Sequence, residues 1–431
     1  MTHPDILPSL VYADETGNIR DFPELAMAGS ANGSFYRPEL SDLIPLPDGS
    51  ELFTLPDRKP IGTDLLSGEP LLLDKSPEGM DIQAVAAFMA PAHTAVYSAA
   101  FQAGDSPVLL PLFAYTAVGW HGGQFWVTGF RSDDDRRQDY QQFKQSLITK
   151  KTRSKLSRHQ DNRLIQHLGK CCLTYHCPAA RNYFLGRWEA PLPTSPSCNA
   201  RCLGCISLQP SGCCPSTQER LHFVPSVHEI AEIAIPHLEK ANRAIVSFGQ
   251  GCEGEPLLQA PLIERAIRLI RDKTSAGTIN LNSNASLPGS VERLARAGLD
   301  SIRVSINSAQ QMYYNRYYRP VNYTFDDVVA SIRTMKKAGK FVSLNYFILP
   351  GFSDSHDETE ALCSLIEHTG PDFIQLRNLN IDPDWYRKTL EIPEGLERYG
   401  IRAWLLRIKK LFPELMFGYY NPFLPDFPHL S

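Results

Sequence analysis

The sequence has 431 residues, of which 43% are hydrophobic, and a formal net charge of −4 at pH 7. This length and composition suit a globular chain of two or three domains. The net charge gives no support to bulk attraction to nucleic acid or to an anionic membrane surface, so we do not expect a nucleic-acid partner. The N-terminal stretch MTHPDILPSLVYADE lacks the basic and apolar runs of a secretory signal, so we expect a cytoplasmic protein.

Residues 1–130 are rich in Pro, Gly and short apolar runs such as GGQFWVTGF, which predicts a β-rich N-terminal domain of unassigned role. The uncharged stretch 82–104 is long enough to raise the question of a membrane span. Pro91 and His93 interrupt it, so we expect strands or a buried helix and no membrane partner. Residues 131–186 predict a charged helical connector that ends in a cysteine-containing segment.

Residues 187–385 alternate short β-rich runs with longer amphipathic runs, as successive βα units do. The expected strands are 187–196, 243–250, 278–285, 301–307, 341–348 and 372–379. The expected helices are 226–241, 260–273, 289–298, 324–339 and 357–370. We therefore predict an α/β fold with a partial (β/α)6 barrel, followed over 386–431 by a helix and an aromatic tail.

Three cysteines follow the first expected strand in a C-x3-C-x2-C spacing, at Cys198, Cys202 and Cys205. The end of a barrel strand is where such folds carry their chemistry. Three thiolates leave one coordination position of a metal centre open, which favours a reactive centre. A zinc site completed by Cys213, Cys214 or His222 remains the alternative.

The cysteine spacing resembles the cluster loop of the radical S-adenosylmethionine (SAM) superfamily. Further runs resemble, in order, motifs of its branch with the molybdenum-cofactor cyclase and peptide-modifying enzymes. These runs are SFGQGCEGEPLL, LNSNASLPGSVERLARAGLDSIRVSINS and SLNYFILPGFSDSHDE. The resemblance covers about residues 188–385 and implies the same partial barrel.

The resemblance implies that the three cysteines hold a [4Fe-4S] cluster whose fourth iron binds SAM. One electron then cleaves SAM reductively to a 5′-deoxyadenosyl radical. It also implies a SAM-binding set that consists of Gly254, Glu255, Pro256, Ser283, Asn284, Ser305, Asn307 and Asn345. The expected partners are an electron donor such as flavodoxin or ferredoxin and an unidentified peptide or small-molecule substrate.

Two positions depart from the family pattern. Gly204 stands where an aromatic residue usually contacts the adenine, and Asn307 stands where an aspartate is usual. The implied reaction is the modification of a peptide, a protein or a cofactor precursor, with no catalytic residue assigned.

Five further cysteines flank the predicted cluster loop and leave an auxiliary iron–sulfur cluster, a zinc site or unmetallated thiols open. They are Cys171, Cys172, Cys177, Cys213 and Cys214. The alternative function is a non-catalytic binding protein in which zinc or an iron–sulfur group stabilises a barrel that has lost SAM chemistry.

Overall fold

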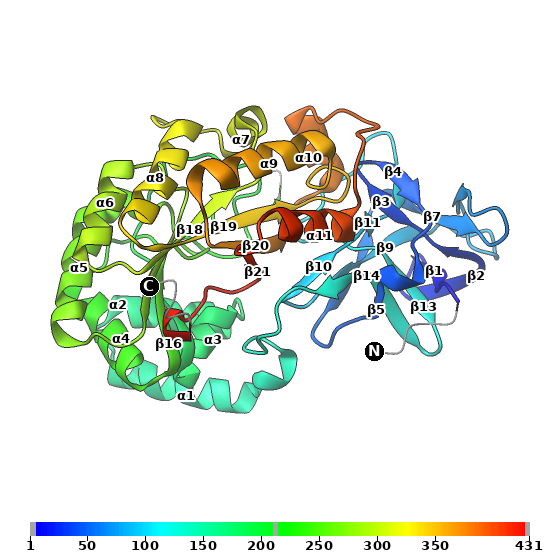
Figure 1. Cartoon of the computed structure of the whole chain (residues 1–431). Coiled ribbons are helices and arrows are strands. Elements are labelled where there is room, and N and C mark those ends of the chain that lie inside the picture. Colours follow the sequence, from blue (N-terminus) through cyan, green and yellow to red (C-terminus); the bar gives the residue numbers. More distant parts are fainter. Residues whose placement is uncertain (1–5, 210–213, 427–431) are drawn as a thin grey trace. The chain divides into compact units, whose positions relative to one another are not determined.

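The computed structural model describes residues 6–209 and 214–426 (Figure 1). Contacts divide the chain into two compact units. The first unit comprises 1–134, 347–361 and 376–413, and the second comprises 135–346, 362–375 and 414–431. Among the described helices, none is long and apolar enough to cross a membrane.

The N-terminal part of the first unit is β-rich, as its sequence predicts, and its strands pair antiparallel. The strands are β1 (Ser9–Ala13), β2 (Ile19–Met27), β3 (Gly29–Ala31), β4 (Ser34–Tyr36), β5 (Leu43–Pro45), β6 (Glu51–Leu55), β7 (Arg58–Asp64), β8 (Pro70–Leu72), β9 (Gln83–Phe88), β10 (His93–Ala95), β11 (Ser98–Ala99), β12 (Phe101–Ala103), β13 (Val118–His121) and β14 (Gln124–Arg131). Eleven form one sheet with the central order β10-β14-β13-β1-β2-β7-β12, and β11, β3 and β4 form a second. The stretch 82–104 is thus divided among β9 to β12.

Turn chemistry and a small apolar core explain this arrangement. Gly122 and Gly123 join β13 to β14 with φ values of +60° and +79°, a conformation that glycine adopts without a steric penalty. Val11, Val85 and Val127 lie in one buried cluster between the strands. This cluster is therefore mainly aliphatic and built from alternate strand residues, and further buried clusters add aromatic rings such as Tyr115 and Trp126.

Three helices precede the barrel: α1 (Gln145–Arg158), α2 (Arg163–Leu173) and α3 (Pro178–Leu185). Helix α1 is largely exposed, as the charged sequence predicts, but α2 buries Leu164, Ile165 and Leu168. Asn162 caps α2 by accepting a hydrogen bond from the Ile165 amide. These helices are packed elements of the second unit rather than a free linker.

A parallel sheet of seven strands follows, with the strands in chain order from β15 to β21. The strands are β15 (Arg187–Pro191), β16 (Asn242–Phe248), β17 (Thr278–Ser283), β18 (Ser301–Ile306), β19 (Phe341–Ile348), β20 (Phe373–Asn378) and β21 (Met416–Gly418). The intervening helices are α4 (Val227–Lys240), α5 (Ala260–Lys273), α6 (Pro288–Ala297), α7 (Gln311–Tyr318), α8 (Phe325–Lys337), α9 (His356–Thr369), α10 (Pro383–Leu390) and α11 (Ile401–Leu411). Figure 1 shows α5, α6 and α8 side by side along one face of the sheet.

The predicted fold class is confirmed, because a curled α/β half-barrel accompanies an N-terminal β-rich region. All six predicted strands are present. The first ends at Pro191, earlier than predicted, because prolines lack the amide hydrogen that a strand ladder needs. The sequence analysis missed β21, which pairs with β20 inside the predicted aromatic tail. The division of the chain into two compact units also falls inside the predicted barrel segment 187–385. The four domain ranges predicted from the sequence therefore stay predictions.

Protonation of one buried histidine is expected to make the second unit less stable in acid. His237 of α4 lies 2.7 Å from the Trp188 carbonyl oxygen through Nε2, and burial lowers its pKa from 6.5 to about 4. Below pH 6.5 the unfolded chain binds the proton first, so stability falls as the pH drops toward 4, by up to about 3 kcal/mol. Urea unfolding between pH 7 and 4.5 measures this loss. His237→Gln should flatten the slope, and an unchanged slope in that variant would refute the assignment.

Candidate functional site

The predicted cluster loop follows β15 and is fastened on one side by the residues after β16. The Gly254 amide donates to the Ser195 carbonyl oxygen at 2.7 Å, and the Glu255 amide donates to that of Ser197 at 2.8 Å. A Cβ added at Gly254 would lie 2.0 Å from the Ser197 carbonyl oxygen. The glycine of the predicted SAM motif is thus required by a close approach of two backbones.

On its other side the same loop is held by the end of α7. The amides of Arg201 and Leu203 donate to the carbonyl oxygens of Tyr318 and Tyr317, at 2.9 and 3.0 Å. An isolated β-bridge between Ala200 and Pro320 continues this contact. The cysteines therefore lie on a loop whose backbone is fixed by two separate parts of the second unit.

Cys198, Cys202 and Cys205 are all half-buried and influence one another electrostatically. The pKa of Cys198 is raised to about 11, mainly by burial and secondly by the Glu255 carboxylate. Burial also raises the pKa of Cys202 well above its usual range. Because a bound metal deprotonates a coordinating thiol, a metal centre would relieve the cost of holding these thiolates.

The spacing of the three thiols suits a cluster better than a single ion. Across 6–209 and 214–426, only His167, Cys171 and Cys252 bring three ligand atoms within 4.8 Å of one another. The sulfur atoms of Cys198, Cys202 and Cys205 are therefore more widely spread. An iron–sulfur cluster gives each thiolate its own iron, so a wider spread of ligands fits it.

Glu255 is the centre of the predicted SAM-binding set. Its buried carboxylate accepts hydrogen bonds from Ser283 Oγ at 2.6 Å, the Asn284 amide at 2.9 Å and the Leu257 amide at 3.0 Å. Burial raises the pKa of Glu255 to about 7, against the opposing effect of the hydrogen bonds from Ser283 and Asn284. Pro256 begins the short helix that follows and is buried. The structure thus joins the ends of β16 and β17 through one carboxylate.

The remaining predicted SAM residues lie along β18 and β19. Ser305 stands directly beside Asn345 in the register of the two strands, and both are half-buried. Asn307 is buried and donates through Nδ2 to the Tyr313 carbonyl oxygen at 3.2 Å. The structure therefore groups Ser305 with Asn345 and ties Asn307 to α7.

Sequence reasoning missed a set of tyrosines beside the cysteine loop. Tyr314 and Tyr318 stack with ring centroids 4.5 Å apart, and the hydroxyls of Tyr314 and Tyr323 are 3.2 Å apart. The charge of Cys202 affects the pKa of all three, although burial is the main reason that these values are raised. The sequence could have indicated these tyrosines, because the short run QQMYYNRYYRPVNY contains five of them.

Glu253 was also missed, although it lies inside the quoted motif. Its buried carboxylate accepts from the amides of Thr194 and Ser195 with one oxygen and from those of Gly249 and Gln250 with the other, at 2.7–2.9 Å. Four amide donors favour the ionised form, whereas burial is the larger effect and raises the pKa of Glu253 to about 7. Through these hydrogen bonds, Glu253 joins the start of the cysteine loop to the end of β16.

Among the described flanking cysteines, Cys171 and Cys172 face different partners. Cys172 lies 3.4 Å from Thr152 Oγ1, whereas Cys171 lies beside His167 and Cys252. Cys214 is buried, and Cys213 lies outside the described residues. Their role as ligands of an auxiliary cluster stays a prediction.

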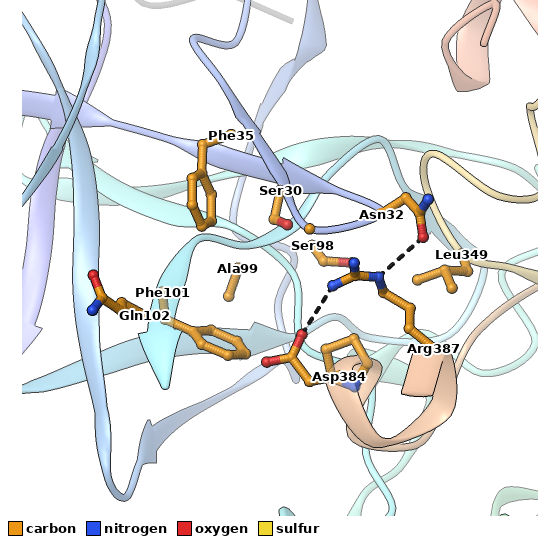
Figure 2. Close-up of a pocket in the computed structure, with 12 residues that line it drawn as sticks. Ser30, Asn32, Phe35, Ser98, Ala99, Phe101, Gln102, Leu349, Asp384 and Arg387 are labelled. Carbon is orange, nitrogen blue, oxygen red and sulfur yellow. Dashed lines mark hydrogen bonds and ion pairs between the residues drawn. The ribbon is translucent and has the colours of Figure 1, made fainter. Parts of the chain in front are cut away.

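A separate cavity of about 340 Å³ lies in the first unit (Figure 2). The Arg387 guanidinium donates to Asn32 Oδ1 at 3.0 Å and pairs with Asp384 at 3.3 Å, and the Phe35 and Phe101 rings lie nearby in the cavity. None of the predicted site residues is among those that line it. The cavity is thus distinct from the cysteine site of the second unit.

Comparisons with known proteins identify the region around the cysteines. Residues 192–363 match the family model of the Radical SAM superfamily. The FeMo cofactor biosynthesis protein NifB of Klebsiella pneumoniae is 24% identical over 178 residues, which are 38% of this chain and 38% of that protein. The match therefore spans well under two thirds of that relative.

Two solved structures are also similar in part. The structure of HydG, a maturase of the [FeFe]-hydrogenase, matches with 16% identity and a TM-score of 0.38 over 63% of this chain and 66% of that one. The structure of Streptococcus suis SuiB bound to the precursor peptide SuiA matches with 13% identity and a TM-score of 0.38 over 58% and 55%.

Proposed function

Because residues 192–363 are a radical SAM domain and place the chain in that superfamily of enzymes, we propose that it cleaves SAM reductively at a [4Fe-4S] cluster. The substrate class is a peptide, a protein or a cofactor precursor. The observation that carries the proposal is the placement of Cys198, Cys202 and Cys205 on a loop bound directly to Gly254 and Glu255. This arrangement supports the proposal, because backbone hydrogen bonds join the loop that carries the three cysteines to Gly254 and Glu255.

The donor set fits the proposed cluster. Cys198, Cys202 and Cys205 would hold the cluster through three thiolates, which would leave one position for SAM. When bound, the cluster supplies the single electron that cleaves SAM to methionine and a 5′-deoxyadenosyl radical, which takes a hydrogen atom from the substrate. The protein's part is to fix the loop, orient SAM and exclude water. The buried tyrosines of α7 exclude water beside Cys202.

The proposed SAM contacts follow from the groups at the strand ends. Glu255 uses three acceptor positions within the protein, and a carboxylate has about four, so one remains for the ammonium group of SAM. Gly254 and Pro256 shape this segment. Ser283, Asn284, Ser305, Asn307 and Asn345 supply hydroxyl and amide groups for the SAM carboxylate and ribose.

The test is anaerobic reconstitution with iron and sulfide, reduction by dithionite in the presence of SAM, and chromatographic measurement of 5′-deoxyadenosine. The wild type should form it, and Cys202→Ala should form none. Cys363→Ser on α9 is the control and should match the wild type. A wild type that takes up zinc at this loop and leaves SAM intact would favour the alternative, a metal-stabilised binding protein.

Glu255→Gln is expected to weaken SAM binding while iron content stays unchanged. The substitution removes the charge that would face the SAM ammonium group, and a charge-assisted hydrogen bond of this kind corresponds to roughly a 10- to 100-fold change in Kd. Anaerobic calorimetry measures the Kd of SAM, with Glu360→Gln on the exposed face of α9 as the control. Equal affinity in wild type and Glu255→Gln would remove Glu255 from the SAM site.

Arg220→Gln is expected to make the reduction potential of the cluster more negative. Arg220 donates to Cys205 Sγ at 3.3 Å and to Ser207 Oγ at 3.1 Å. A cation at a ligand sulfur stabilises the reduced, more negative cluster, and its removal lowers the potential. A redox titration followed by electron paramagnetic resonance measures the shift. Arg265→Gln, exposed on α5, should leave the potential unchanged.

A further inference from the structure

We propose that His167, Cys171 and Cys252 form a binding site for a single zinc ion, separate from the predicted cluster loop. This trio is defined by its contacts and does not depend on SAM chemistry. His167 and Cys171 are four residues apart on α2 and therefore share one helix face. Cys252 comes from the segment between β16 and the short helix at Pro256, far from α2 in the sequence.

The ligand atoms have the spacing of a tetrahedral zinc site. Cys171 Sγ lies 3.6 Å from His167 Nε2, and the three ligand atoms lie within 4.8 Å of one another. With zinc–sulfur and zinc–nitrogen bonds of about 2.3 and 2.0 Å, tetrahedral angles put a nitrogen about 3.5 Å and a second sulfur about 3.8 Å from a ligand sulfur. The distance between Cys171 Sγ and His167 Nε2 matches one shared ion, and the 4.8 Å limit on the three ligand atoms sets them apart from the more widely spread cluster cysteines.

The site is enclosed and lies beside a further thiol. Cys171 is 1% exposed and Cys252 is 4% exposed, whereas His167 is half-buried. Cys177, at the start of α3, donates its amide hydrogen to the Cys171 carbonyl oxygen at 3.1 Å. A Cys177 side chain turned toward the trio would supply a fourth ligand and give the Cys3His set of structural zinc sites.

The proposed ion would cross-link α2 to the loop that carries the SAM motif. Cys252 directly precedes Glu253, and its carbonyl oxygen accepts from the Leu221 amide at 2.7 Å. Glu253 clamps the cysteine loop, and Gly254 and Glu255 bind it through their amides. Zinc would therefore fix the base of the proposed SAM-binding segment, as a structural rather than a reacting metal.

The chain provides a matched control on the same helix. Cys172 is buried next to Cys171, but its sulfur faces Thr152 of α1 at 3.4 Å. Cys172→Ser also replaces a buried sulfur by oxygen, but it leaves the three proposed zinc ligands unchanged. A general loss of folding after a thiol replacement in α2 would affect both variants, whereas loss of zinc alone would affect only Cys171→Ser.

The experiment measures zinc and iron per chain by plasma mass spectrometry on full-length protein purified anaerobically without chelators. We expect about one zinc per chain in the wild type and in Cys172→Ser, and almost none in Cys171→Ser and Cys252→Ser. A variant with Cys198, Cys202 and Cys205 replaced by alanine should keep zinc while it loses iron. Cobalt titrated into metal-free wild type should give the intense visible bands of a tetrahedral thiolate site.

Three results would overturn the proposal. The first is a wild type that binds neither zinc nor cobalt in a folded state. The second is iron and sulfide that persist in the triple alanine variant, which would assign these thiols to a second cluster. The third is a thiol count that rises by two on reduction, which would indicate a Cys171–Cys252 disulfide. Failure of 5′-deoxyadenosine formation leaves the zinc measurement valid, so the two proposals fail separately.

Discussion

Gly254→Ala is expected to abolish 5′-deoxyadenosine formation and to lower the free energy of unfolding by at least about 3 kcal/mol. The added Cβ would lie 2.0 Å from the Ser197 carbonyl oxygen, 2.4 Å from its carbonyl carbon and 3.1 Å from the Cys198 nitrogen. All three are backbone atoms, so no side-chain rotation relieves the clash. The loop must move, and Cys198 moves with it.

The displacement would also break hydrogen bonds that hold the loop. The Gly254 amide donates to Ser195 and the Glu255 amide to Ser197, so separation of the two backbones removes both contacts. Each lost buried hydrogen bond adds about 1 kcal/mol to the cost. Iron content after reconstitution, SAM cleavage and a urea unfolding curve measure the three consequences.

Gly289→Ala is the matched control. Gly289 lies in the first turn of α6, is exposed, and has no atom within 4 Å of the position of an added Cβ. Alanine is the better helix former by about 1 kcal/mol, so this variant should be as stable as the wild type or slightly more stable. If Gly254→Ala behaved like Gly289→Ala, the close approach at the cysteine loop would not be a requirement of the site.

The barrel was predictable because its local signals agree with its tertiary structure. Strands β16 to β20 are short runs in which apolar residues recur, several of them at alternate positions, and α5 and α8 are amphipathic over almost the predicted ranges. Strand β21 was hidden because it has only three residues and is defined by its pairing with β20. A strand of that length carries no periodicity, so only the folded sheet reveals it.

The sequence predicted only those candidate site residues that a family motif identifies by residue type. Motif resemblance located Glu255, Ser283 and Asn284, and the structure joins them by hydrogen bonds. The pairing of Cys171 with Cys252 was not predictable, because it depends on how α2 packs against the loop after β16. Backbone partners also leave no trace in a sequence, which is why the role of Glu253 was missed.

Glu253→Gln is expected to lower the free energy of unfolding by about 2–4 kcal/mol and to reduce cluster incorporation. Glutamine has nearly the same shape but replaces one acceptor oxygen by an NH2 group. One pair of amides, either Thr194 with Ser195 or Gly249 with Gln250, would then face a donor instead of an acceptor. Either orientation of the amide releases one of the two segments that Glu253 joins.

Glu239→Gln is the control for the loss of the Glu253 contacts, because Glu239 is exposed on α4. The same substitution there should change the free energy of unfolding by less than about 0.5 kcal/mol. Urea unfolding of both variants gives the difference in stability, and iron content after reconstitution shows whether the cysteine loop still binds the cluster. A Glu253→Gln protein with wild-type stability would mean that the two segments hold each other without the carboxylate. A less stable protein with full iron content would instead confine the role of Glu253 to folding, and would leave the positioning of the cysteines to Gly254 and the end of α7.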